Sequence, residues 1–167
     1  MNPATAINAS TLTIIVVLVV LHLRTFIKGG KDPKMLLSSL GGMIAGSSLA
    51  MSVGGALGLF ATYIVGSVNA AAAVAPWATG TSDRVIASVT PQGLTMEGGL
   101  IVVTVAAVSW VSIREAGKKE TQRLLGGLIS GAALTYTGGF GGLVNSTLIP
   151  LYNGTGGQLI AFVENLA

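Results

Sequence analysis

LGGMIAGSSL at residues 40–49 recurs 85 residues later as LGGLISGAAL at residues 125–134, and six of the ten positions are identical. With a slip of one residue, GGALGL at 54–59 then matches GGFGGL at 138–143. The apolar run and the basic loop before each stretch fall in register as well. Glycine-rich segments can match by chance, but the shared order of apolar run, basic loop and glycine-rich helix favours a tandem duplication.

Composition indicates a membrane protein, or a protein that starts in a membrane and assembles out of it. Of the 167 residues, 51% are apolar and 9% are charged, whereas soluble domains carry about 25% charged residues. Glycine contributes 24 residues and aromatic side chains only 5%. The chain has no cysteine, which excludes disulfides, thiolate metal sites and thiol nucleophiles. An ordinary soluble enzyme, a disordered segment and a soluble nucleic-acid module are all excluded.

The apolar segments predict an all-α fold. They lack the alternation of membrane barrel strands and exceed the strand length of about 9–11 residues, so helix is the remaining way to satisfy the backbone in lipid. We expect two tandem helical hairpins built from four main hydrophobic helices. The second helix is too long for one span, and it should extend beyond the membrane or bend near Gly54 and Gly55. The four segments are 12–23, 35–75, 98–113 and 124–151.

Turn-forming residues divide the chain into four parts. We expect a first hairpin at 1–75, an outer connector at 76–95, a second hairpin at 96–150 and an outer C-terminal tail at 151–167. The connector is polar and contains two prolines, and the tail carries Asn153 and Gly154 near its start.

Basic residues set the expected orientation. Eight of the nine lie in two clusters, and the positive-inside rule places both clusters on the cytoplasmic side of the membrane. The N-terminus, the connector and the C-terminus would then all lie outside. The first cluster is Arg24, Lys28, Lys31 and Lys34, and the second is Arg114, Lys118, Lys119 and Arg123.

Both glycine-rich helices carry glycines four residues apart. Small residues at this spacing let two helix backbones approach closely, which is the main attraction available between helices in lipid. Packing within one hairpin and packing between subunits both fit this pattern. The pairs are Gly42 with Gly46, Gly54 with Gly58, Gly127 with Gly131, and Gly138 with Gly142.

No residue pattern supports catalysis, so we expect no enzyme, no metal site and no cofactor apart from bound membrane lipid. His22 is the only histidine and has no partner that would make a metal site, so we expect it to pack or to lie at the interface. A proton or ion carrier needs an ionisable group inside the membrane. The acidic residues instead lie in loops, at helix ends or in the tail: Asp32, Asp83, Glu97, Glu115, Glu120 and Glu164.

Three Asn-x-Ser/Thr triplets begin at Asn8, Asn145 and Asn153. All three fall near the expected outer side, where glycosylation would occur. Such triplets are also common by chance.

The repeated unit of apolar helix, short basic turn and Gly/Ala-rich helix resembles the pilins of conjugative type IV secretion systems, particularly archaeal DNA-import pilins. The resemblance covers residues 11–68 and 96–150. It implies a subunit of the cell membrane that becomes part of an extracellular helical filament, with its basic loops cytoplasmic before assembly. Its partners would be further copies of itself as a homopolymer, membrane lipid, single-stranded DNA passing through the lumen, and the secretion-system assembly machinery.

Carried over by position, the eight clustered basic residues would line the lumen of such a tube. Ammonium and guanidinium groups pair with lipid phosphates and contact a passing DNA backbone without sequence preference. The same residues could do no more than set the topology. Two further classes therefore stay open: a membrane-resident pore former, small channel or carrier, and a membrane subunit of a larger complex or virion. Abundant glycine and absent intramembrane charge favour assembly over transport.

Overall fold

The computed structural model describes residues 7–52, 54–80, 84–87 and 93–166. It confirms the all-α prediction, because helices form nearly all of the described chain apart from one short antiparallel pairing of β1 (Ile7–Asn8) with β2 (Val85–Ala87). The helices are α1 (Ala9–Lys28), α2 (Pro33–Met51), α3 (Gly55–Ala72), α4 (Val74–Thr79), α5 (Met96–Glu115), α6 (Lys118–Thr135), α7 (Gly138–Leu143), the π-helical turn η2 (Val144–Leu148) and α8 (Ile149–Glu164).

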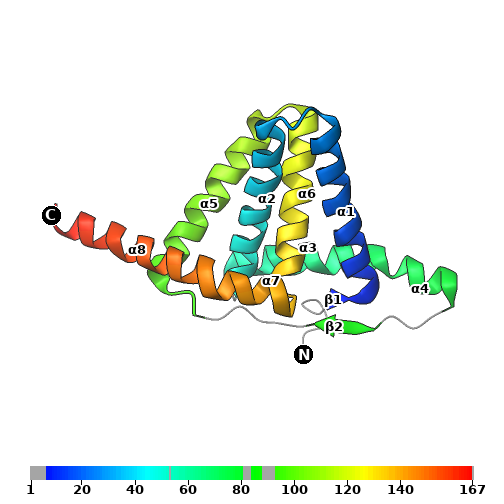
Figure 1. The fold of residues 1–167 in the computed structure, drawn as a ribbon. Coiled ribbons are helices and arrows are strands. Elements are labelled where there is room, and N and C mark those ends of the chain that lie inside the picture. Colours follow the sequence, from blue (N-terminus) through cyan, green and yellow to red (C-terminus); the bar gives the residue numbers. More distant parts are fainter. Residues whose placement is uncertain (1–6, 53, 81–83, 88–92, 167) are drawn as a thin grey trace.

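Four helices stand side by side in the order α5, α2, α6, α1 (Figure 1). The glycine-rich helices α2 and α6 form the central pair. Of these two inner helices, each outer helix contacts mainly the one of the other half: α1 lies along α6, and α5 lies along α2. The two predicted hairpins therefore interlock. At the lower end, α3 and α4 run across the bundle in one direction and α7, η2 and α8 in the other (Figure 1).

The central pair repeats the same contact on both sides. A Cβ added at Gly42 would lie 3.0 Å from the nitrogen of Leu128, and one added at Gly127 would lie 3.0 Å from the nitrogen of Met43. Met43 and Leu128 are themselves equivalent under the 85-residue shift. Gly42 thus meets Leu128 where the equivalent residues, Gly127 and Met43, meet each other. Such reciprocal contacts are the pattern of an isologous two-fold interface. The duplicated halves pair as two subunits of a symmetric dimer would.

The second pair of glycines extends this contact by one turn. A Cβ added at Gly46 would lie 2.8 Å from the nitrogen of Ala132, and one added at Gly131 would lie 2.7 Å from the carbonyl carbon of Met43. Real Cβ atoms essentially never come closer than 3.0 Å to such atoms. Only glycine at these positions permits the observed separation of α2 and α6, as small-xxx-small helix pairs require.

The long second segment breaks where the sequence predicted a bend. Helix α2 ends at Met51, and α3 begins at Gly55 after Gly54 and Gly55 adopt φ values of +102° and +63°. These are left-handed conformations that favour glycine. Beyond the bend, α3 is tied to α1, because Thr11 Oγ1 donates a hydrogen bond to Asn69 Oδ1 at 2.6 Å.

The prediction of a single helix over 124–151 followed by a tail at 151–167 is wrong. Helix α6 ends at Thr135, and helical structure then resumes in α7 and continues through η2 and α8 to Glu164. Glycine-rich sequence has a weak intrinsic helix preference, but here it lets α8 lie against α5. A Cβ at Gly156 would meet the nitrogen of Gly98 at 3.0 Å. Tertiary contact therefore outweighs local propensity in this stretch.

Three helical segments of the described chain, rather than the four expected, are long and apolar enough to cross a membrane: α1, Gly55–Ala78 and α5. Helix α6 falls short because Lys118, Lys119, Glu120 and Arg123 occupy its first two turns. Helices α1 and α5 stand with the bundle, while α3 and α4 lie across it (Figure 1). The segment Gly55–Ala78 therefore runs across the direction of α1 and α5.

Candidate functional site

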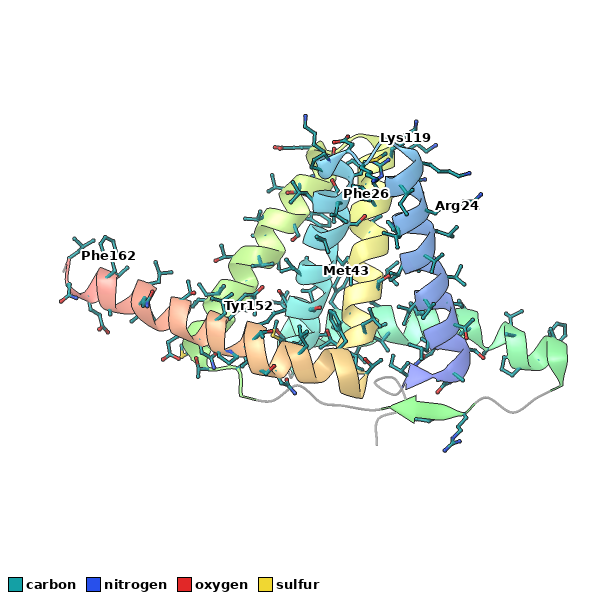
Figure 2. All side chains as sticks on the ribbon, viewed as in Figure 1. Arg24, Phe26, Met43, Lys119, Tyr152 and Phe162 are labelled. Carbon is teal, nitrogen blue, oxygen red and sulfur yellow. The ribbon has the colours of Figure 1, made fainter. Side chains whose placement is uncertain are left out.

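Both basic clusters lie at one end of the upright bundle. Figure 2 shows Arg24 and Lys119 toward the upper end, where α1 turns into α2 and α5 turns into α6, with α8 and the β1–β2 pairing at the other end. The two basic turns therefore lie at the same end of the folded chain, and their cytoplasmic orientation stays a prediction.

Local capping shapes the two turns. In the first, Lys31 adopts φ +59° and Asp32 caps α2 by accepting a hydrogen bond from the backbone nitrogen of Lys34 at 3.0 Å. In the second, Gly117 precedes α6, so that Lys118 and Lys119 begin that helix. Two lysines at the positive end of a helix dipole raise the local positive potential and favour an anion there.

A cavity of about 740 Å³ opens between the end of α1 and the start of α6. Four of the eight predicted cations line it, namely Arg24, Lys28, Lys119 and Arg123. Its remaining wall is mixed, with the apolar side chains of Leu18, Leu21, Phe26 and Met35 beside the polar side chains of His22, Thr25, Ser39 and Gln122. An anionic head group bonded to an apolar chain matches such a lining better than a free anion or a purely apolar ligand does.

The cavity cations carry no internal counter-charge within the part of the chain that the structure describes. None of the four has a carboxylate oxygen within 4.0 Å of its charged nitrogens. The nearby carboxylate of Glu120 instead accepts a hydrogen bond from Ser38 Oγ at 3.0 Å. Crowded like charges repel one another unless an anion neutralises them, so this end of the molecule is suited to bind one.

The other four predicted cations share this end of the molecule but do not line the cavity. They are Lys31, Lys34, Arg114 and Lys118. The guanidinium of Arg114 sits over the Trp110 ring, 5.9 Å from its centroid, which is within the range of a cation–π interaction. The structure therefore divides the eight residues into a cavity group of four and an outer group of four.

The contact between α1 and α6 beside the cavity was not predicted from the sequence. The His22 ring lies against Gly126, where an added Cβ would be 2.8 Å from Nε2, and Nδ1 lies 2.7 Å from the carbonyl oxygen of Leu18. The expected packing role of His22 is confirmed. The first glycine of each LGG triplet could have indicated a close contact at Gly126, but nothing in the sequence predicts that His22 makes this contact.

The eight glycines predicted to allow close helix packing have different surroundings within the chain. Gly42, Gly46, Gly127 and Gly131 lie in the α2–α6 contact. At Gly54, Gly138 and Gly142 an added Cβ would meet no atom within 4 Å, so packing of these three glycines between subunits stays a prediction. The break after α2 and α6 turns these residues away from the central pair. Gly58 is buried in α3.

The three candidate glycosylation residues have different surroundings. Asn8 precedes α1 in the short β1 strand. Asn145 lies in η2, and its Oδ1 is buried without a hydrogen bond. Asn153 joins α8 to the start of α5: its Oδ1 accepts from Thr95 nitrogen at 3.0 Å, and its Nδ2 donates to the Gly93 carbonyl at 2.7 Å. Glycosylation stays a prediction, and Asn153 acquires a structural role that its triplet did not suggest.

No protein-family model matches the chain, and neither the curated proteins nor the solved structures contain a significant match. Function must therefore be inferred from the residues and geometry described above.

Proposed function

We propose that the chain is a structural, pilin-like subunit that leaves the membrane and assembles into a helical, lipid-containing tube for DNA transfer or secretion. The observation that carries this proposal is the collection of eight cations at one end of a helical body with apolar flanks. In a tube, that end faces the lumen and the flanks face neighbouring copies and lipid. Members of the pilin group that the repeat resembles are built in this way.

The flanks support assembly because they are too apolar to face water. Leu23 on α1 is 52% exposed, and Val103 and Val108 on α5 are 56% and 61% exposed. Exposed apolar patches of this kind mark surfaces that are covered by lipid or by another protein. The same chain can then lie in a bilayer before assembly and pack against its own copies afterwards.

The internal pairing of the halves supports an open assembly. The α2–α6 contact is closed, since each half uses the same glycines against the other. A closed contact cannot extend a polymer, so growth must use other surfaces in a heterologous, head-to-tail manner. When the rotation between neighbouring subunits does not close a ring, such contacts give a helical filament. The exposed faces of α1 and α5 are suitable for this purpose.

The cationic end supports passage or retention of a polyanion. A lumen lined by lysine and arginine attracts DNA phosphates without reading sequence, and anionic lipid head groups in the lumen would moderate that attraction. Single-stranded DNA is therefore the proposed cargo, and the assembly machinery of a secretion system is the proposed partner during export.

Electron microscopy of material sheared from cells producing an epitope-tagged chain tests this proposal. Tubes decorated along their length by an antibody to the tag are expected. A chain found only in the membrane fraction, with no labelled filament, would overturn the proposal. That result would favour a membrane-resident pore former or a subunit of a membrane complex, which the two upright apolar helices α1 and α5 also suit.

A further inference from the structure

An apolar groove of about 480 Å³ lies between α1 and α3. Ile14 and Leu18 of α1 form one wall, and α3 forms the other over residues 60–71, which is about 16 Å of helix. None of the described residues that line the groove is charged. An exposed apolar surface of this kind marks a place that another apolar group covers.

The last two turns of α8, with the two residues after them, form an exposed apolar arm over residues 159–166. This arm extends beyond α5, and every residue from 161 to 166 is exposed (Figure 1). Its apolar side chains are Leu159, Phe162, Val163 and Leu166, which follow the spacing i, i+3, i+4 and i+7. Phe162 is 62% exposed and lies near the far end of α8 (Figure 2). Residues at this spacing share one face of a helix, and a helix that enters an apolar groove uses anchors spaced in this way.

The arm and the groove lie on opposite sides of the molecule at the same end of the bundle. Figure 1 shows α8 running across the lower end to one side, while α3 runs across it to the other. A second copy that is shifted sideways, with its bundle upright, therefore brings its arm to the level of the groove. A contact between two different surfaces of the same subunit is heterologous, so it can extend a row of subunits.

The direction of the groove favours a helix over an acyl chain as its occupant. The wall formed by α3 runs crosswise to α1 and α5 (Figure 1), whereas acyl chains in a bilayer crossed by these two helices would run alongside them. The arm has the required direction, because α8 also lies across the bundle. Residues 159–166 span about 11 Å, which fits within the length of the α3 wall.

The chain already contains a contact of this kind. The earlier part of α8 lies against α5, where Gly98 and Gly156 bring the two backbones together. Helix α5 is the counterpart of α1 in the repeat, since residues 101–105 align with residues 16–20 under the 85-residue shift. The space beside α5 is thus filled by α8 of the same chain, whereas the space beside α1 is left open for a helix from another copy.

We propose that the arm of one copy binds in the groove between α1 and α3 of the next copy. Phe162 and Val163 enter the groove and cover its apolar walls, while Glu164, on the opposite face of α8, stays outside. Each subunit then offers one arm and one groove, so the contact is repeated from copy to copy. This inference deepens, and rests on, the assembly of subunits proposed above.

Disulfide trapping tests the contact directly, because the chain has no cysteine of its own. Full-length chains with different tags, one carrying Ser67→Cys in the groove and the other Val163→Cys in the arm, are mixed in phosphatidylcholine vesicles and oxidised. Two control pairs each move one cysteine: Ala70→Cys replaces Ser67→Cys at an exposed position outside the groove, and Ala161→Cys replaces Val163→Cys on the opposite face of the arm. Because a disulfide needs Cβ atoms about 3.5–4.5 Å apart, the first pair should give about five times more mixed disulfide than either control pair.

Three results would overturn the proposal. Equal yields from all pairs would show random collision. A predominance of disulfides between two Ser67→Cys chains would show that α3 pairs with α3 of another copy. No disulfide in any pair would show that lipid, and not protein, covers the groove.

A chain that carries both Ser67→Cys and Val163→Cys separates an open assembly from a closed one. The arm and the groove of one molecule lie on opposite sides and cannot join each other, so oxidation should give a ladder of dimers, trimers and larger products. A ladder that stops at the dimer would contradict the head-to-tail contact.

Removal of an anchor tests the strength of the contact. Phe162→Ala should weaken self-association of the chain in a neutral detergent about tenfold, as loss of a buried aromatic anchor does, and Glu164→Ala should leave it nearly unchanged. Equal effects of the two variants in analytical ultracentrifugation would refute Phe162 as an anchor and with it the proposed contact. These measurements need no filament. A disulfide ladder without tubes would refute the proposed function and leave this inference standing, whereas tubes without the arm–groove disulfide would refute this inference alone.

Discussion

Substitution of Gly46 by alanine tests the close pairing of α2 and α6. The added Cβ would lie 2.8 Å from the nitrogen of Ala132 and closer still to the carbonyl oxygen of Leu128, where ordinary contact begins at 3.4 Å. Both atoms belong to the α6 backbone and cannot rotate away, so the two helices must separate. Such overpacking costs about 3 kcal/mol at the upper end of the usual range. The better helix propensity of alanine returns about 1 kcal/mol, which leaves about 2 kcal/mol of destabilisation.

Gly41 provides the matched control, because it lies on the same helix and a Cβ there meets no atom within 4 Å. Gly41→Ala should raise stability by up to about 1 kcal/mol through propensity alone. Thermal unfolding in a mild detergent, followed by circular dichroism, should place Gly46→Ala about 6 °C below wild type and Gly41→Ala at or above it. Gly131→Ala should match Gly46→Ala, because the equivalent atoms of Met43 oppose it. Equal stability of Gly46→Ala and Gly41→Ala would refute the close pairing.

Two further predictions concern the lower end of the bundle and its orientation. The hydroxyl oxygens of Ser48 and Tyr152 lie 2.8 Å apart in a buried position, so a double-mutant cycle with Ser48→Ala and Tyr152→Phe should give a coupling energy of about 1 kcal/mol; additive effects would argue against that hydrogen bond. Before assembly, Gly154→Cys should react with an impermeant thiol reagent added to intact cells and Gly117→Cys should not, because the basic turns are expected in the cytoplasm. Labelling of Gly117→Cys would reverse the orientation.

The sequence predicted the symmetric features of the fold well. The glycine spacing predicted close helix contacts at Gly42, Gly46, Gly127 and Gly131, although it did not predict that α2 and α6 would contact each other. The bend at Gly54 and Gly55 followed from a segment too long for one span. These features depend on helix periodicity and on the absence of a Cβ. Both are local properties that can be read directly from the sequence.

The exchange of partners between the halves could not be predicted. When two halves have similar sequences, an apolar face on α1 fits the inner helix of either half, and only the packed structure shows that it lies on α6. Helix α8 was missed for a different reason. Its glycines and Asn153 are typical of a loop, and their helical structure depends on contacts with α5 that lie some 58 residues away in the chain.

The candidate site was predicted in part. The basic residue pattern predicted that eight cations share one side, and the structure separates the four that line the cavity from the other four. Which cations line the cavity depends on how α1 packs against α6, and the sequence does not determine that packing.

The most direct measurement of the central claim is a helical reconstruction, by cryo-electron microscopy, of filaments formed by the chain. We expect an open tube in which both basic turns face the lumen, with one lipid density per subunit whose head group lies near Arg24 and Lys119. A closed ring, or a filament with these two residues on its outer surface, would contradict the account.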